Sequence, residues 1–262
     1  MAKTGRIVMI LVGLGLMAGQ ARAGLVTFVG EDFQPNPGST VRTNSDAAAA
    51  SFRTAALAVG PVGTITFESS PLGAFNNLTV AQGVTVNGTD LSGNAQTIRN
   101  SSGFPSAPSL DGSNTTAGGS KFVEMTGGTL TFTFATPTQF FGAYLTGVQT
   151  AFFSDSITFN DGTTQTITLQ GAGTSSFRGE IVFVGFVDAG KLITSITINA
   201  GDPGPNSTTG EDFIGVDDVS FQAQAVPEPS SLTLCAIAVV PALWHTRRRR
   251  RAAVDSRVHR ND

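Results

Sequence analysis

Thr129-Leu130-Thr131-Phe132-Thr133-Phe134 alternates threonine with large apolar residues at every position. Successive side chains of a strand point to opposite faces, so this stretch predicts a strand with one face in a core and the other in water. Threonine suits the second face because its β-branched side chain favours the extended backbone and its hydroxyl faces water. The stretch therefore predicts a sheet whose outer face is polar without being charged.

The same alternation recurs along most of the chain, in Thr64–Phe67, Leu78–Val80, Val84–Val86, Ser156–Phe159 and Thr166–Leu169. Between the last two runs, Asn160-Asp161-Gly162-Thr163 supplies residues that tolerate positive φ, which indicates a hairpin. Further strands are expected at Leu25–Val29, Ile181–Val187, Leu192–Ile198 and Phe213–Phe221. Many short strands separated by turn residues predict an all-β fold, namely an antiparallel β-sandwich that is jelly-roll-like.

One short helix and one long loop interrupt this pattern within a single predicted domain, residues 24–225. The helix is expected at about residues 46–59, with Asp46 as its N-cap and Gly60-Pro61 as its stop. Helical spacing places four apolar residues on its packed face: Phe52, Ala55, Ala56 and Val59. The loop is the segment from about 100 to 120, dense in Ser, Gly, Asn and Pro, which we expect to be flexible.

The first 23 residues have the three parts of a secretory signal peptide. Lys3 and Arg6 form a basic start, and Ile7–Ala18 is apolar. Ala21 and Ala23 then fit the small-x-small rule for cleavage, so we expect signal peptidase to cut before Gly24. The sequence thus predicts export.

Residues 226–251 also have three parts in a fixed order. Pro227-Glu228-Pro229 is followed by the apolar segment 231–244 and then by the basic block Arg247, Arg248, Arg249, Arg250 and Arg251. The apolar run from Leu232 to Trp244 has 13 residues, against roughly 20 for a bilayer span, but flanking residues can snorkel and the bilayer can thin. With the arginines kept cytoplasmic, this predicts an inner-membrane anchor helix; the alternative is a buried core helix with a solvated basic tail.

This order of features resembles the PEP-CTERM sorting signal of exported bacterial proteins, which membrane enzymes called exosortases process. Pro227-Glu228-Pro229 is the literal motif, and the resemblance covers about a tenth of the chain. It implies recognition by an exosortase at Pro-Glu-Pro, cleavage, and delivery to the cell envelope, cell surface or extracellular matrix. The polar tail, residues 252–262, is longer than is usual for this signal.

The composition of residues 24–225 excludes several functions. The range holds only six basic residues against 16 Asp and Glu, a net charge near −10 that argues against nucleic acid as a partner. The range contains no histidine and no cysteine, because His245, His259 and Cys235 all lie after residue 225. Ser-His-Asp and Cys-His catalysis and His or Cys zinc sites are therefore excluded from this range.

Carboxylates are the remaining candidate ligands. Glu31-Asp32, Glu211-Asp212 and Asp217-Asp218 could each offer hard oxygen donors for Ca²⁺ or be plain solvated charges, and the second interpretation is favoured for Glu31-Asp32. Ile214–Phe221 looks like the closing strand of carbohydrate-binding-module-like jelly rolls, and Ile65-Thr66-Phe67-Glu68 resembles their early strand. The resemblance implies a structural calcium ion held by Glu68, Asp217 and Asp218.

The geometry of a strand leaves an alternative to this calcium hypothesis open. Side chains alternate across a strand, so Asp217 and Asp218 are not both expected to point inward. The alternative is a pair of aspartates at a sheet edge, facing water.

These patterns predict an exported, surface- or matrix-associated, noncatalytic protein sorted by its C-terminal signal. The first alternative is a module that binds extracellular polysaccharide, assisted by calcium; an enzyme with paired carboxylates is the next. Sugars usually stack on exposed Trp or Tyr, and this range holds only Tyr144. A concave sheet face lined by Tyr144, Asn and Asp, with a bound sugar, would favour the polysaccharide alternative.

Overall fold

A computed structural model describes residues 24–33, 42–100, 112–148, 153–169, 180–200 and 213–224. The predicted signal peptide and the sorting signal with its anchor lie outside the described residues, as do Arg178, Glu211 and Asp212. The chain divides into two compact units, residues 1–222 and 223–262, and the fold below belongs to the first. No helix of the described part is both long and apolar enough to cross a membrane.

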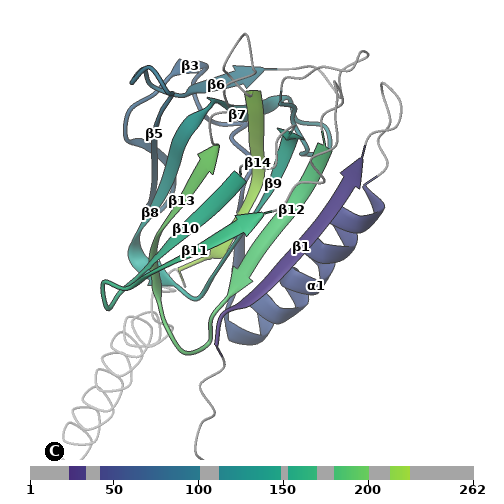
Figure 1. The fold of residues 1–262 in the computed structure, drawn as a ribbon, viewed down its shortest axis with the longest axis vertical. Helices are drawn as coiled ribbons and strands as arrows, with labels where there is room; N and C mark the ends of the chain where they lie inside the picture. Colours follow the sequence, from purple (N-terminus) through teal and green to yellow (C-terminus); the bar gives the residue numbers. More distant parts are fainter. Residues whose placement is uncertain are drawn as a thin grey trace, which may run out of the picture. The chain divides into compact units, whose positions relative to one another are not determined.

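Two antiparallel sheets pack face to face, which confirms the predicted β-sandwich (Figure 1). We call the first sheet A; its strand order is β1-β12-β9-β14-β7-β6-β3, and β2 also pairs with β14. Sheet B has the order β11-β10-β13-β8-β5-β4. The strands of sheet A are β1 (Val26–Phe33), β2 (Val62–Ile65), β3 (Gly73–Ala74), β6 (Thr97–Asn100), β7 (Lys121–Thr126), β9 (Phe140–Val148), β12 (Glu180–Val187) and β14 (Phe213–Gln222). Those of sheet B are β4 (Leu78–Ala81), β5 (Val84–Thr89), β8 (Gly128–Thr138), β10 (Phe153–Phe159), β11 (Thr164–Leu169) and β13 (Ile193–Ala200).

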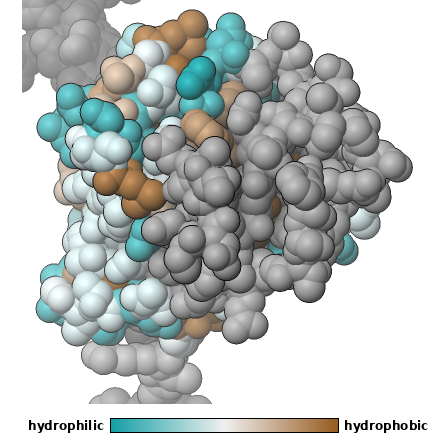
Figure 2. Space-filling view, turned by 45° about the horizontal axis from the view of Figure 1, so that its top comes forward, coloured by the Kyte–Doolittle hydropathy of each residue, from teal (hydrophilic) through white to brown (hydrophobic). Residues whose placement is uncertain are grey.

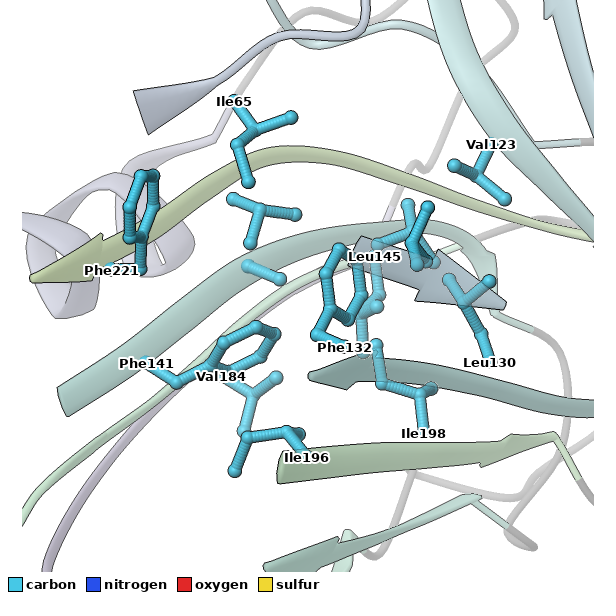
Figure 3. Packing of buried hydrophobic residues seen from close by; sticks show 14 of the residues in the cluster. Ile65, Val123, Leu130, Phe132, Phe141, Leu145, Val184, Ile196, Ile198 and Phe221 are labelled. Atoms are coloured by element: carbon cyan, nitrogen blue, oxygen red, sulfur yellow. The ribbon is translucent and has the colours of Figure 1, made fainter. Parts of the chain in front are cut away.

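The core lies between the two sheets and is built from the apolar half of the alternating pattern (Figure 3). Phe132 of β8 meets Phe141 of β9 across the sandwich, with ring centroids 5.3 Å apart. Phe134 stacks on Phe221 at 6.5 Å. Burying each such ring contributes about 1.5–3 kcal/mol, so the alternation in β8 fixes which face of sheet B is inside.

The helix α1 (Thr43–Val59) packs on the outer face of sheet A, against β1 and β12 (Figure 1). Its Phe52 lies over Gly142 and Gly185, which are paired across β9 and β12. A Cβ on Gly185 would come within 2.6 Å of the Phe52 ring, so the two glycines form the hollow that receives it. The predicted packed face of the helix is confirmed, since Phe52 and Ala56 are buried and Ala55 and Val59 pack beside them.

The start of α1 differs from the prediction, because Asp46 is not the N-cap. Asp32 of β1 caps the helix instead, accepting hydrogen bonds from the backbone N–H of Asn44 (2.9 Å) and of Ser45 (2.7 Å). The predicted solvated charge at Asp32 is therefore wrong, as its side chain is buried against the first helical turn. Asp46 lies within that turn.

The exposed large apolar side chains of the described part are single residues: Val26, Val29, Leu57, Leu72, Leu91 and Leu192. On the face seen in Figure 2, apolar surface forms small separate patches among polar surface. Isolated residues of this kind are normal on a folded domain and indicate no large apolar contact area there.

Candidate functional site

The 112–121 segment is packed on the outer face of sheet A, next to β14 and β9. Gly112 lies directly on Gly215, where a Cβ on Gly112 would collide with the β14 backbone. Ser113 N–H donates to the hydroxyl of Thr146 on β9 at 2.7 Å, and that hydroxyl donates back to the Ser113 carbonyl at 2.8 Å. Residues 112–115 are buried. Of the loop predicted over 100–120, residues 101–111 lie outside the described part, and the rest is a packed cover.

Two neighbouring aspartates of β14 hold the middle of this segment. Asp217 Oδ2 accepts hydrogen bonds from the backbone N–H of Thr115 (2.8 Å) and of Thr116 (3.1 Å). The hydroxyls of the same two threonines donate to Asp218, at 2.9 and 2.7 Å. These four hydrogen bonds attach the middle of the segment to β14.

A break in the strand allows both carboxylates to reach the same threonines. Asp218 has φ of 46°, and the register of β14 against β9 shifts between Asp217 and Ser220. Simple alternation, which places the two side chains on opposite faces, is therefore wrong at this point, because a bulge re-aims one of them. The alternative of a water-facing pair is wrong for Asp217, which is 0% exposed.

Glu68 holds the far end of the 112–121 segment. Its Oε1 accepts hydrogen bonds from Ser120 N–H (2.7 Å), Lys121 N–H (2.8 Å) and the Asn114 side-chain amide (3.1 Å). The Lys121 ammonium donates to the carbonyls of Glu68 (2.9 Å) and Ser70 (2.7 Å). The chain reaches this position through Phe67, which has φ of 57°.

The pKa of Asp217 is raised to about 7, chiefly because burial disfavours its charged form. The Thr115 N–H opposes this shift and the nearby charge of Asp218 adds to it. Its Oδ1 is buried with no hydrogen-bond partner. The two threonine hydroxyls each lie within 3.3 Å of both carboxylates but carry one proton apiece, so they cannot donate to both. A proton on Asp217 relieves this shortage.

The three carboxylates predicted to bind calcium all contact the 112–121 segment. They do so by accepting hydrogen bonds from it. Backbone N–H groups point at Glu68 Oε1 and Asp217 Oδ2, where a cation would need free lone pairs. Within the described ranges, no three Asp, Glu, His or Cys side chains form a group that could share a metal ion. The donor set therefore fits loop anchoring better than a metal centre, and the calcium site stays a prediction.

Sequence reasoning missed the partners of these carboxylates, Asn114, Thr115 and Thr116. They are far away along the chain, since Thr115 and Asp217 are 102 positions apart. A stretch of Asn and Thr is typical of any polar loop. No local signal identifies them.

Tyr144 is not an open platform for a sugar ring. The Arg42 guanidinium lies 5.3 Å from the centre of its ring, and Phe183 makes an edge contact at 5.1 Å. Its hydroxyl donates to Asp46 at 2.7 Å. Burial and this bond raise the pKa of Tyr144. The bond also links β9 to the first turn of α1.

The outer face of sheet B is the second candidate site, and we call it the hydroxyl face. Its outward positions fall into three cross-strand rows. The rows are Thr164, Thr158, Ser195, Thr133, Thr85 and Thr79; Thr166, Ser156, Thr197, Thr131 and Asn87; and Asn199, Thr129 and Thr89. All these side chains are exposed or half-buried, and none is charged or aromatic. The sequence predicted this polar, uncharged surface.

Comparison with known proteins gives little more. No protein-family model matches the sequence, and no curated protein matches it. A solved structure of a mutant family 29 carbohydrate-binding module, complexed with mannohexaose, is similar over 62% of this chain and 91% of that module. The identity is 9% and the TM-score 0.30, a level of likeness that carries no argument about a ligand.

Proposed function

We propose that this chain is an exported, noncatalytic protein of the cell surface or extracellular matrix, sorted by a PEP-CTERM signal. The observation that carries the proposal is the order Pro227-Glu228-Pro229, apolar 231–244 and Arg247–Arg251, opposite a signal peptide at residues 1–23. Signal peptidase acts after Ala23. An exosortase then acts at Pro-Glu-Pro while the apolar segment lies in the inner membrane.

The sandwich supports a noncatalytic role through the use it makes of its carboxylates. A glycosidase needs two carboxyl groups that touch substrate from opposite sides. Asp217 is fully buried beneath the 112–121 segment, and Asp32 is buried against the start of α1. These two carboxylates therefore hold covering elements in place instead of lining a cleft.

The sorting proposal is tested with Glu228→Ala in the full chain. We expect the variant to be exported but to accumulate uncleaved in the inner membrane, measured by fractionation and by its mass. Asp255→Ala, which changes a carboxylate in the polar tail, is the matched control and should be processed like the wild type. Normal release of Glu228→Ala to the surface would overturn the exosortase proposal.

A second candidate function is binding of extracellular polysaccharide. The observation that favours it is the polar, uncharged hydroxyl face. Tyr144 does not favour it, because Arg42 and Phe183 contact its ring. Screening the purified chain on a glycan array tests this function. Absence of binding to any glycan would remove it and leave the sorting proposal untouched.

A further inference from the structure

The chemistry of the hydroxyl face excludes most classes of partner. Its described outward positions carry no Lys or Arg to neutralise phosphate, so nucleic acid and anionic lipid are poor partners. The same described positions hold no Trp, Tyr or large aliphatic side chain to anchor a protein partner. What remains is a neutral ligand that both donates and accepts hydrogen bonds.

The arrangement of the face is regular. Strands lie about 4.8 Å apart and alternate residues along a strand about 6.8 Å apart, so the rows form a two-dimensional grid. Two of the rows run through β5, β8, β13 and β10, and the third runs through β5, β8 and β13. At the centre, the hydroxyls of Thr131 and Thr197 are 2.9 Å apart and bond to each other. A ligand with hydroxyls at repeated intervals can meet such a grid at several points at once.

The side chains of the grid are held before any ligand arrives. Threonine is stiff at χ1 because of its β-branch, so ordering it on binding costs little entropy. Each hydroxyl offers one donor and two acceptor positions, the same set that a sugar hydroxyl offers. Single contacts of this type are weak, but several along one polymer add up, and bridging waters can take part.

We propose that the hydroxyl face of sheet B binds a neutral, hydroxyl-rich polysaccharide through the grid centred on Thr131, Thr197 and Thr133. This inference rests on the proposed function, because it assigns the matrix component that an exported chain would meet. Anionic polysaccharides are disfavoured, since the face has no cation to pair with them and residues 24–225 are strongly acidic.

The test is electrophoresis of the full chain in native gels that contain neutral dextran, neutral mannan or anionic alginate. We expect retardation in at least one neutral gel and none in alginate. The double variant Thr131→Val with Thr197→Val keeps the β-branched shape and removes two hydroxyls, so it should bind roughly tenfold more weakly. The matched double variant Thr131→Ser with Thr197→Ser keeps the hydroxyls and should bind like the wild type.

A second control lies on the other side of the molecule. Thr54→Val removes an exposed hydroxyl of α1 that bonds to the Ala50 carbonyl, and it should leave retardation unchanged. Circular dichroism confirms that each variant is folded. Retardation by alginate alone, equal binding by the valine and serine variants, or no retardation in any gel would overturn the inference. So would a change of oligomeric state in the valine variant, which would make the face a contact between copies.

Failure of this inference and failure of the sorting proposal can be told apart. Processing of Glu228→Ala reports on sorting and does not involve the hydroxyl face. A chain that is sorted normally but is not retarded overturns only the binding inference.

Discussion

The two outer faces of the sandwich differ, because the face of sheet A is covered by other parts of the chain and the described face of sheet B is polar and uncharged. The outer face of sheet A is covered by α1 and by the 112–121 segment. A buried carboxylate attaches each cover, namely Asp32 for α1 and Asp217 for the segment. The three rows on the outer face of sheet B consist of uncharged Thr, Ser and Asn. The acidic residues that make residues 24–225 strongly negative therefore include structural attachments, and charge alone does not identify the binding surface.

The two buried aspartates that attach these covers, Asp32 and Asp217, have pKa values shifted in opposite directions. Burial alone would raise the pKa of Asp32, but hydrogen bonds from Ser45 and Asn44 outweigh it and the pKa is lowered. For Asp217 burial prevails, because Oδ1 has no partner and Asp218 lies close by. Asp32 is therefore a stabilising anion at a helix start, whereas Asp217 is an anchor that favours its protonated form.

The largest expected effect concerns the apolar contact beneath α1. Phe52→Ala should lower the free energy of unfolding by about 3–5 kcal/mol, because the ring fills the hollow over Gly142 and Gly185. Leu57→Ala on the same helix is the control, since Leu57 is exposed and should cost within about 0.5 kcal/mol. Urea unfolding measures both. Equal costs would mean that α1 does not cover sheet A as described.

Removing the helix cap should have a smaller effect. Asp32→Ala leaves the N–H groups of Asn44 and Ser45 without their acceptor, at a cost of about 2 kcal/mol. Asp32→Asn keeps one acceptor oxygen and should cost less. Thermal unfolding followed by circular dichroism gives the order of the three proteins. An alanine variant as stable as the wild type would contradict the capping role.

Calcium should have the smallest effect on stability. An ion shared by Glu68, Asp217 and Asp218 would make chelation lower the Tm, and Asp218→Ala would abolish that dependence. Because N–H donors already occupy two of these carboxylates, we expect the same Tm with calcium and with chelator. A lower Tm in chelator, lost in Asp218→Ala, would confirm the predicted calcium site.

The sequence predicts sheet B far better than sheet A, for a physical reason. Strands such as β8 face core on one side and solvent on the other, so their alternation is visible in the letters. The central strand β9 is buried on both faces, with Phe141 toward the core and Phe140 toward α1. Such a strand shows no alternation, which is why Phe140–Val148 and Lys121–Thr126 were not predicted as strands.

The candidate site on sheet A could be predicted only in part. Glu68, Asp217 and Asp218 were singled out, but their partners depend on contacts between residues about 50 to 100 positions apart. The bulge at Asp218, which aims both aspartates at one pair of threonines, leaves no mark in the local pattern. The uncharged character of the hydroxyl face, in contrast, is local and was predicted.

The pH dependence of stability in Asp217→Asn tests most directly whether the cover of sheet A is held by a buried, protonated carboxyl. The folded pKa of Asp217 is about 7, above the ordinary 3.8. The folded state therefore keeps its proton longer than the unfolded state, so the stability contributed by Asp217 falls as pH rises from about 4 to 7 and then levels off. Asparagine keeps an acceptor for the Thr115 N–H and cannot ionise, and Asp161→Asn at an exposed turn is the control. We predict that the Tm of Asp217→Asn rises relative to that of the wild type as the pH increases from 4 to 7. A constant Tm difference between the two proteins across that range would contradict the account.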